Sequence, residues 1–83
     1  MIEVTMPMFG EVMEEGTIAS WKKHIGDRVE RGETIAEVEM DKAVMPLEAS
    51  DSGILVEIRV QEGQSARVNS VLAIMEQEPP PRG

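Results

Sequence analysis

The chain repeats itself with a shift of 37 residues, and this duplication limits the folds open to it more than any other feature. The match runs without a gap from Gly16 to Val38 and again from Gly53 to Met75. Within it, Gly32 pairs with Asn69, and both residue types can adopt positive φ, so the repeat preserves a backbone conformation as well as hydrophobicity. Two copies are too few for a solenoid. We therefore expect two interlocked halves related by a quasi-two-fold axis. Other matched pairs are Ile18 and Leu55, Trp21 and Ile58, Gly26 and Gly63, Val29 and Ala66, Ile35 and Leu72, and Ala36 and Ala73.

Each copy is a series of short strands separated by turns. Alternation of apolar and polar residues is typical of half-buried strands, and glycines and prolines interrupt every stretch long enough for a helix. Apolar residues fall three apart at Ile18 and Trp21, and again at Leu55 and Ile58, which predicts a β-bulge or sharp twist in each copy. We therefore expect an all-β fold of about eight strands in two facing sheets. The expected strands include residues 2–6, 16–21, 36–41, 43–48, 53–60 and 71–75.

Lys42 lies where two of these expected strands meet. One run alternates from Ala36 to Asp41, and the next begins at Ala43. Only Asp41 and Lys42 are left for the turn, and an aspartate side chain readily accepts hydrogen bonds from turn backbone. Most lysines near turns are simply solvated charges. A lysine at a hairpin tip nevertheless directs its amine into water, where another protein can reach it, so Lys42 is a candidate functional residue.

The composition excludes several kinds of chemistry. The 83-residue chain is long enough for one small domain. It has no cysteine, so it has no thiol nucleophile, and any sulfur chemistry has to come from a cofactor. The net charge of −8 argues against nucleic acid or an anionic membrane as partner and favours a basic protein surface. Apolar runs are too short to span a membrane. His24, the single histidine, is expected to be a solvated loop residue.

The repeat also predicts where the lysine and the chain ends lie. Shifting Lys42 by 37 residues leads to Thr5 in one direction and to Pro79 in the other, near the two ends of the expected strands. The lysine turn is therefore expected at one pole of the molecule and the paired termini at the opposite pole. Three consecutive prolines near the end favour an extended polyproline II conformation. We expect residues 1–76 to form the domain and residues 77–83 to begin a linker.

This ordered set of residues closely resembles the lipoyl domain of 2-oxo acid dehydrogenase complexes, which belongs to their dihydrolipoyl acyltransferase component. The resemblance runs from about Met6 to Met75 and implies a flattened barrel, or barrel-sandwich hybrid, of two four-stranded antiparallel sheets with quasi-two-fold symmetry. Each match alone is weak, whereas the set in this order is specific. The matches are Met6-Pro7, Gly10, Glu15-Gly16-Thr17-Ile18, Trp21, Gly26-Asp27, Val29, Gly32, Glu37-Val38-Glu39, Asp41-Lys42-Ala43, Glu48-Ala49, Gly53, Ile58, Val60 and Gly63.

The resemblance assigns roles to particular residues. Lys42 corresponds to the lysine that carries lipoic acid in amide linkage, and Asp41 and Ala43 correspond to the flanks of its turn. Glu39 and Gly53 correspond to positions that the family uses for recognition by the modifying or reductase partners.

The resemblance also implies a loop and shows one departure. Residues 8–15 correspond to a surface loop near the lysine turn that helps the decarboxylating component recognise its carrier. Most members have threonine or serine before the aspartate, whereas this chain has Met40. The alternation places Met40 on the inner face, so the turn is expected to form while specificity near the tip can differ.

The resemblance implies a carrier that has no catalytic residue of its own. A lysine amine is a cation near neutral pH, with a reference pKa of about 10.4, and has no redox function. Linkage to lipoic acid removes the charge and supplies a dithiolane on a flexible arm. The implied partners are a thiamine-diphosphate-dependent 2-oxo acid decarboxylating component, a dihydrolipoamide dehydrogenase and a lipoate ligase or transferase. The acyl group then passes to coenzyme A at a separate domain. A linker raises the effective concentration of the arm at each site. We expect a monomeric domain in the bacterial cytoplasm or the mitochondrial matrix.

Two other functions are compatible with such a fold. A biotinyl carrier domain shares it, but that family places methionines on both sides of its lysine, where this chain has Asp41 and Ala43. An unmodified barrel-sandwich adaptor module needs no lysine in the hairpin, so its function would survive Lys42→Ala. Attachment of lipoate, of biotin or of neither separates the three alternatives.

Overall fold

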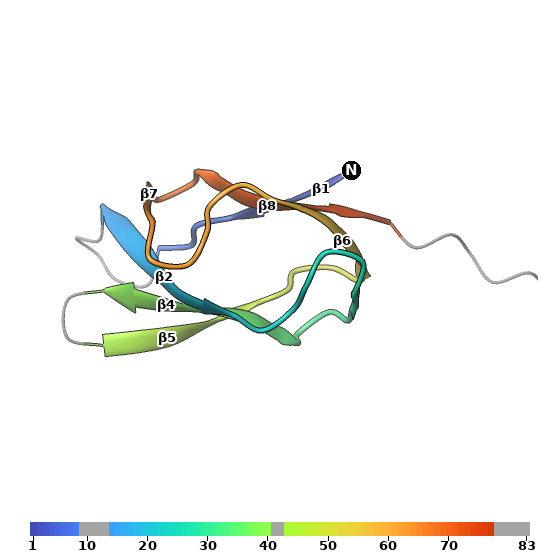
Figure 1. Ribbon diagram of the computed structural model, residues 1–83, viewed down its shortest axis with the longest axis horizontal. Helices are drawn as coiled ribbons and strands as arrows, with labels where there is room; N and C mark the ends of the chain where they lie inside the picture. Colours follow the sequence, from blue (N-terminus) through green and yellow to red (C-terminus); the bar gives the residue numbers. More distant parts are fainter. Residues whose placement is uncertain (9–13, 41–42, 78–83) are drawn as a thin grey trace, which may run out of the picture.

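The computed structural model describes residues 1–8, 14–40 and 43–77. This part of the chain forms eight strands and contains no helix that is long and apolar enough to cross a membrane. The strands make two four-stranded antiparallel sheets that face each other (Figure 1), which confirms the expected all-β fold. The strands are β1 (Ile2–Thr5), β2 (Glu15–Trp21), β3 (Arg28–Val29), β4 (Thr34–Met40), β5 (Ala43–Glu48), β6 (Gly53–Ile58), β7 (Ser65–Arg67) and β8 (Val71–Glu76).

The two copies of the repeat are interlocked through these sheets. One sheet has the strand order β5–β4–β2–β7 and is called the hairpin sheet below, and the other has the order β1–β8–β6–β3 and is called the terminal sheet. Each copy supplies its short strand to the sheet of the other copy, since β3 pairs with β6 and β7 pairs with β2. In the terminal sheet, β1 pairs with β8 in the way that β5 pairs with β4 in the hairpin sheet. This exchange confirms the quasi-two-fold arrangement.

The predicted bulge is present in each copy at equivalent positions. The register of β2 against β4 shifts by one residue, and the register of β6 against β8 shifts at the position 37 residues later. An extra residue in one strand lets apolar side chains three apart both face the core. A second pair of shifts, which the sequence did not indicate, interrupts the pairing of β4 with β5 and of β8 with β1. The residues without a cross-strand partner at the four shifts are Ala19, Ile35, Val56 and Leu72.

Positive φ angles also come in equivalent pairs. Among the described residues they occur at Gly26 (99°) and Gly63 (83°), and at Gly32 (85°) and Asn69 (74°). Asn69 is the one non-glycine residue of this set. The sequence match of Gly32 with Asn69 thus reflects a shared left-handed turn, as predicted.

The glycine turns connect the two copies through reciprocal backbone hydrogen bonds. The amide of Gly26 donates to the carbonyl of Leu55 at 2.7 Å, and the amide of Gly63 donates to the carbonyl of Ile18 at 2.8 Å. Leu55 and Ile18 also donate in return. The Leu55 amide donates to the carbonyl of Asp27, and the Ile18 amide donates to the carbonyl of Gln64, both at 3.0 Å. Each half therefore fixes its turn on the central strand of the other half.

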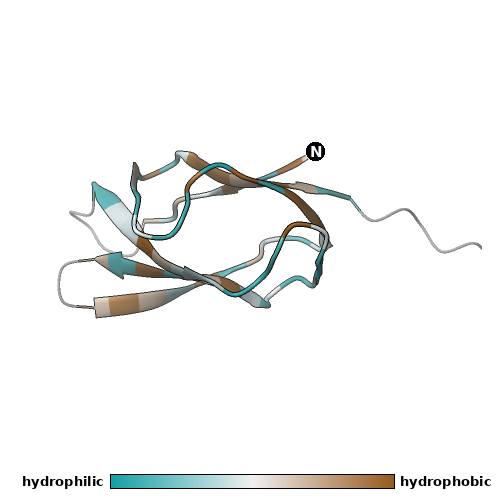
Figure 2. Cartoon of the chain, in the orientation of Figure 1, coloured by the Kyte–Doolittle hydropathy of each residue, from teal (hydrophilic) through white to brown (hydrophobic). Residues whose placement is uncertain are grey.

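The core between the sheets is aliphatic, with apolar residues along the facing strands (Figure 2). No polar or charged residue is buried in the part of the chain that the structure describes. Trp21 is only half-buried; it packs against the core, and its indole Nε1 donates to the carbonyl of Val60 at 2.9 Å. The largest fully buried side chains are Met6, Ile18, Val29, Ile35, Val38, Leu55, Leu72 and Met75.

The end of β4 and the start of β5 lie at one pole, and the N-terminus and the end of β8 lie at the other (Figure 1). This confirms the predicted poles, but the equivalence of Lys42 with Thr5 was wrong. Thr34 of β4 pairs with Glu48 of β5, and its repeat equivalent Val71 pairs with Thr5 of β1. Thr5 therefore corresponds to Glu48, and β1 corresponds to β5 at a separation of 43 residues. The positions equivalent to the hairpin turn are therefore those where the chain enters β1 and leaves β8. Pro79 and the rest of 78–83 lie outside the described residues, so the linker stays a prediction.

Replacing Trp21 with alanine is expected to lower the free energy of unfolding by about 3 kcal/mol, because it removes both the packing of the ring and the hydrogen bond to Val60. Trp21→Phe keeps most of the packing and is expected to cost only about 1 kcal/mol. Urea denaturation measures both values. Equal losses for the two variants would show that the ring contributes little beyond its hydrogen bond.

Substitutions at Asn69 test whether the repeat preserves a left-handed backbone conformation at this position. Asn69→Ala is expected to cost about 1 kcal/mol because a Cβ without a compensating polar group is unfavourable in the left-handed region. Asn69→Gly is expected to leave stability unchanged within about 0.5 kcal/mol, since glycine adopts this conformation freely. Thermal unfolding of the two variants side by side is the measurement. A glycine variant less stable than the alanine variant would contradict the conformational explanation.

Candidate functional site

The hairpin of β4 and β5 carries the candidate attachment site. Its pairs run from Thr34 and Glu48 to Met40 and Ala43, with one register shift. Asp41 and Lys42 lie outside the described residues, but they are the only residues that join Met40 to Ala43. The predicted hairpin is thus present up to its last described pair, Met40 and Ala43.

Burial decreases along the hairpin towards its tip. In β5, Leu47 is 4% exposed, Met45 is half-buried and Ala43 is exposed, although all three follow the same alternation. In β4, Val38 is fully buried and Met40 is half-buried. Met40 is therefore on the inner face, as predicted. The tip extends beyond the tightly packed part of the core, so residues there can contact another protein.

The outer face of the hairpin sheet carries a row of residues next to the tip. Glu39 pairs with Val44 of β5 on one side and with Thr17 of β2 on the other, and Thr17 pairs with Ser65 of β7. The hydroxyl oxygens Thr17 Oγ1 and Ser65 Oγ are 2.9 Å apart and hydrogen-bonded. We call Val44, Glu39, Thr17 and Ser65 the tip row. The sequence had indicated only Glu39, because nothing in it showed that β7 joins β2.

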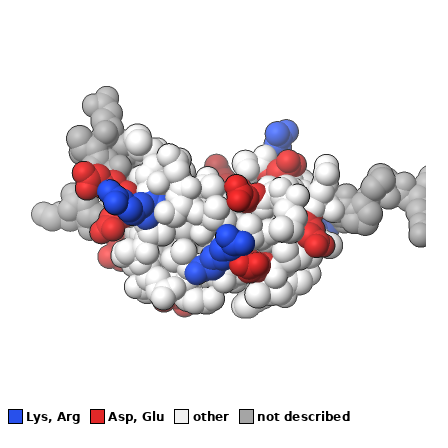
Figure 3. Space-filling model, turned by 90° about the horizontal axis from the view of Figure 1, so that it is seen from above, with Lys and Arg blue, Asp and Glu red and all other residues white. Residues whose placement is uncertain are grey.

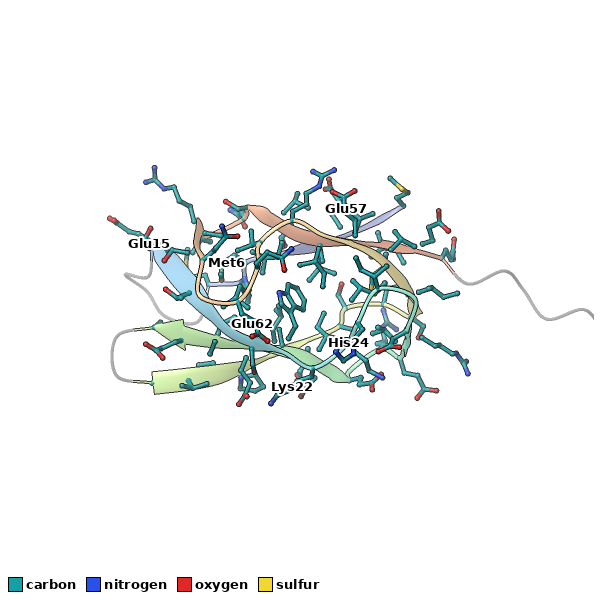
Figure 4. The ribbon with its side chains drawn as sticks, in the orientation of Figure 1. Met6, Glu15, Lys22, His24, Glu57 and Glu62 are labelled. Carbon is teal, nitrogen blue, oxygen red and sulfur yellow. The ribbon has the colours of Figure 1, made fainter. Side chains whose placement is uncertain are left out.

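A second row lies further from the tip and is internally paired. The Lys22 Nζ atom is 2.9 Å from Glu37 Oε1, and the Ser20 hydroxyl donates to the same oxygen at 3.1 Å. The hydrogen bond from Lys22, followed by that from Ser20, lowers the pKa of Glu37. Lys22 points away from the core (Figure 4). In contrast, no described lysine or arginine forms an ion pair with Glu39, so its carboxylate is available to a partner.

Gly53 is not near the tip of the hairpin. It is buried in β6, where it pairs with Val29, and β6 meets the last residue of β8 at this end of the terminal sheet. A Cβ atom on Gly53 would collide with the backbone carbonyl oxygen of Glu76 and would lie 3.5 Å from Ile2 Cδ1. The structure therefore separates Gly53 from Glu39 and Ala43 and gives it a packing role at the pole of the chain ends.

The expected recognition loop is described only at its two ends. Met8 is 59% exposed, and residues 9–13 lie outside the described residues. On the other side, Glu15 pairs with Arg67 and the Glu14 carbonyl accepts a hydrogen bond from Val68 at 2.9 Å. Figure 4 shows Glu15 at the pole of the hairpin. These contacts place the end of the loop on the same side as the tip.

Other surface features lie elsewhere. His24 is exposed, as expected, and no group of three potential metal ligands occurs within the described ranges. A hollow of about 560 Å³ lies at the start of β4, whereas the tip is at the end of β4, about 20 Å away at the usual rise of a strand. Acidic and basic side chains are interspersed on the face of the terminal sheet (Figure 3), where Arg59 Nε is 2.6 Å from Glu57 Oε2. The hollow is lined by Lys23, Arg28, Glu30, Arg31, Gly32 and Glu33.

Comparisons with known proteins agree with this geometry. The biotin/lipoyl family model, described as "Biotin-requiring enzyme", matches residues 2–75. The dihydrolipoyllysine-residue acetyltransferase component of the pyruvate dehydrogenase complex of Rickettsia felis is 46% identical over 78 residues, which cover 93% of this chain and 19% of that protein. The pyruvate dehydrogenase E1 component subunit beta of Rhizobium meliloti is 40% identical, with 93% and 17% covered. The chain thus spans about a fifth of the length of these relatives.

Two solved structures share the fold of this chain, and only one of them is also similar enough in sequence to indicate the kind of carrier domain. The lipoyl domain of the 2-oxoglutarate dehydrogenase complex from Azotobacter vinelandii has a TM-score of 0.74 and 34% identity, covering 93% of this chain and 98% of that domain. The urea carboxylase of Kluyveromyces lactis has a TM-score of 0.68 and 23% identity, covering 84% of this chain and 6% of that enzyme, and shows the fold alone. The chain therefore belongs to the biotin/lipoyl attachment family, and within that family it is a lipoyl domain, a carrier domain that is not catalytic by itself.

Proposed function

We propose that this domain carries lipoic acid in amide linkage to Lys42 and presents it to the active sites of a 2-oxo acid dehydrogenase complex. The observation that carries the proposal is the register of the hairpin, which leaves only Asp41 and Lys42 between the paired Met40 and Ala43. The paired residues Met40 and Ala43 are fixed in the hairpin sheet, so both flanks of the two-residue connection belong to the rigid part of the domain. The loss of burial towards Ala43 supports access to the Lys42 amine.

The residues of this chain fit such a group because they need only to hold its attachment point. The Lys42 Nζ attacks the activated carboxyl carbon of a lipoyl donor, the amide C–N bond forms, the bond to the leaving group of the donor breaks, and the amine loses its protons to water. The attached group supplies a dithiolane that accepts an acyl group together with two electrons. The contribution of the protein is the paired hairpin on either side of Lys42, and a linker would confer a high effective concentration at successive sites.

The relatives support the choice of parent complex and partners. Both curated relatives described above are named as components of pyruvate dehydrogenase, one an acetyltransferase and the other an E1 subunit beta. We therefore assign the domain to a pyruvate dehydrogenase complex, most simply within its acetyltransferase chain. Its partners are then the thiamine-diphosphate-dependent decarboxylating component, dihydrolipoamide dehydrogenase, and the ligase or transferase that attaches lipoate. The bacterial sources of the relatives support a cytoplasmic location. The remaining assignments are Asp41 and Ala43 as turn flanks and Glu39 as a recognition residue.

The alternative of a biotinyl carrier is disfavoured by the flanks of the lysine. Asp41 and Ala43 stand where biotinyl domains have methionines, and Met40 and Met45 are displaced from those positions. The likeness to urea carboxylase is one of fold, which both kinds of carrier share. The choice between the two groups therefore rests on the hairpin residues, and it is directly testable.

Incubation of the chain with a lipoate ligase, ATP and lipoate is expected to add one lipoyl group, and peptide mapping is expected to place it on Lys42. A biotin ligase is expected to add nothing. Lys42→Arg is expected to fold normally and to remain unmodified, because a guanidinium is not acylated under these conditions. Intact mass spectrometry measures all three. Lys22→Arg, which keeps the charge beside Glu37, is the matched control and is expected to be fully lipoylated.

The outcomes of this experiment are distinct. A lipoyl group on Lys42→Arg would overturn the assignment of the site. A biotinyl group on the wild-type chain would favour the biotin carrier, and a folded wild-type chain that neither enzyme modifies would favour the unmodified adaptor.

Gly53 distinguishes a packing role from a contact role. Gly53→Ala is expected to lower the free energy of unfolding by roughly 1–3 kcal/mol, because the added Cβ meets the Glu76 carbonyl and forces β6 and β8 apart. The rate of lipoylation is expected to match the wild type at a temperature where the variant remains folded. Circular dichroism and the ligase assay measure the two effects. A large loss of ligation rate without loss of stability would instead make Gly53 a contact residue.

A further inference from the structure

We propose that Val44 is an apolar contact for the enzyme that attaches lipoate, and that the tip row around it is the docking surface for that enzyme. The inference rests on the proposed function and deepens it, since it names a recognition residue and the chemistry of the surface that binds it. Val44 is 51% exposed, although it lies inside a β-strand and is paired with Glu39.

The exposure of Val44 follows from the alternation of β5. Leu47 and Met45 face the core, so Val44 and Pro46 face outward, and both are exposed. Val44 makes no contribution to the buried core cluster. An exposed aliphatic residue beside a modification site is available for contact with a partner, and burying it there removes apolar surface from water.

The neighbours of Val44 define the chemistry of the partner. Glu39 is directly opposite it across the strand pair, at the usual Cβ separation of about 5 Å, and has no ion-pair partner among the described residues. Beyond Glu39, the hydroxyl groups of Thr17 and Ser65 are hydrogen-bonded to each other and continue the row to the far edge of the sheet. The surface therefore fits a partner with an apolar depression beside a lysine or arginine.

The second row of the same face is not equivalent. There the carboxylate of Glu37 is already bound by Lys22 and Ser20. A partner would gain less from a basic group at that position, because it would have to compete with an existing ion pair. Recognition is therefore concentrated in the tip row, where Glu39 has no such pair with any residue that the structure describes.

The distance over which each partner acts on the lysine side chain indicates which partner contacts this surface. The attaching enzyme has to bring its activated lipoyl group to the amine of Lys42 itself, at the end of one lysine side chain. Residues next to the turn then lie against that enzyme. The partners that act later meet the distal end of the lengthened arm, and the decarboxylating component is expected to recognise the loop of residues 8–15 and not the tip row. Val44, two residues from Lys42, therefore belongs to the interface of the attaching enzyme.

The test compares variants that change one side chain on the intact 83-residue chain. Val44→Thr keeps the β-branched shape, so the strand is retained, and replaces a methyl group with a hydroxyl. The kcat/KM for ligation is expected to fall about tenfold, the lower end of the range for one methylene-sized contact in an apolar site. Val44→Ile keeps an apolar group and is expected to stay within about twofold of the wild type, since it removes no apolar contact. Ile25→Thr is the matched control, because Ile25 is 62% exposed and lies next to His24, towards the other pole in Figure 4.

Each outcome has one meaning. Slower ligation of Val44→Thr at an unchanged melting temperature, with Val44→Ile and Ile25→Thr as the wild type, supports the proposal. Ligation of Val44→Thr at the wild-type rate overturns it. An equal loss for Ile25→Thr would also overturn it, because the effect would not be specific to the tip row. After exhaustive ligation, acylation of Val44→Thr by the decarboxylating component is expected at the wild-type rate; a tenfold loss there with normal ligation would assign the surface to that component. If the wild-type chain is not lipoylated at all, the proposed function fails instead.

Discussion

The reciprocal bonds between glycine turns and central strands are the constraint on which the rest of the structure depends. The amide of Gly26 reaches Leu55 of the second copy, and the amide of Gly63 reaches Ile18 of the first. Each bond requires a positive φ at the glycine, which directs the short strand that follows into the opposite sheet. Neither copy can complete its own sheet alone. The domain is consequently a single cooperative unit despite its small size, and the two sheets hold a fixed relation to each other.

This reciprocity explains why a carrier can be built on so small a domain. The pairing of β4 with β5 is equivalent to that of β8 with β1, but the first pair is closed by a turn and the second is open at the chain ends. One pole therefore offers a closed hairpin and the other offers the entry and exit of the chain. The same framework therefore holds Met40 and Ala43 at one pole and the N-terminus and the end of β8 at the other.

The sequence was most informative where a backbone requirement leaves a trace in residue type. The match of Gly32 with Asn69 indicated a left-handed turn, and the three-residue spacing of Ile18 and Trp21 indicated the bulge, and both are present. The equivalence of Lys42 with Thr5 failed because a repeat period does not reveal which strand closes the second sheet. That strand comes from the start of the chain, so its shift is 43 residues rather than 37.

The site was less predictable than the fold for a related reason. A glycine at position 53 looks the same in the sequence whether it serves recognition or close packing. Only the position of the Glu76 carbonyl in the structure shows the packing requirement. Val44 has no motif of its own, since it becomes notable only when the alternation of β5 turns it outward beside Glu39. Thr17 and Ser65 lie 48 residues apart and meet only because β7 crosses into the hairpin sheet. Recognition here depends on neighbours across strands, which local sequence does not specify.

The proposed lipoylation of Lys42 would change the charge of the hairpin as well as add an arm. In the sequence, the positive charge of Lys42 directly follows Asp41 and lies three residues after Glu39. Conversion of the amine to an amide removes that charge, so the formal net charge of −8 becomes more negative by one, and the change is located at the hairpin. A basic partner surface consequently attracts the modified tip more strongly than the unmodified one, most of all at low ionic strength. The attaching enzyme, in contrast, has to bind the less acidic form and release the more acidic one. A contact with Val44 suits this order, because an apolar contact gains its free energy from burial and not from a charge that the reaction removes.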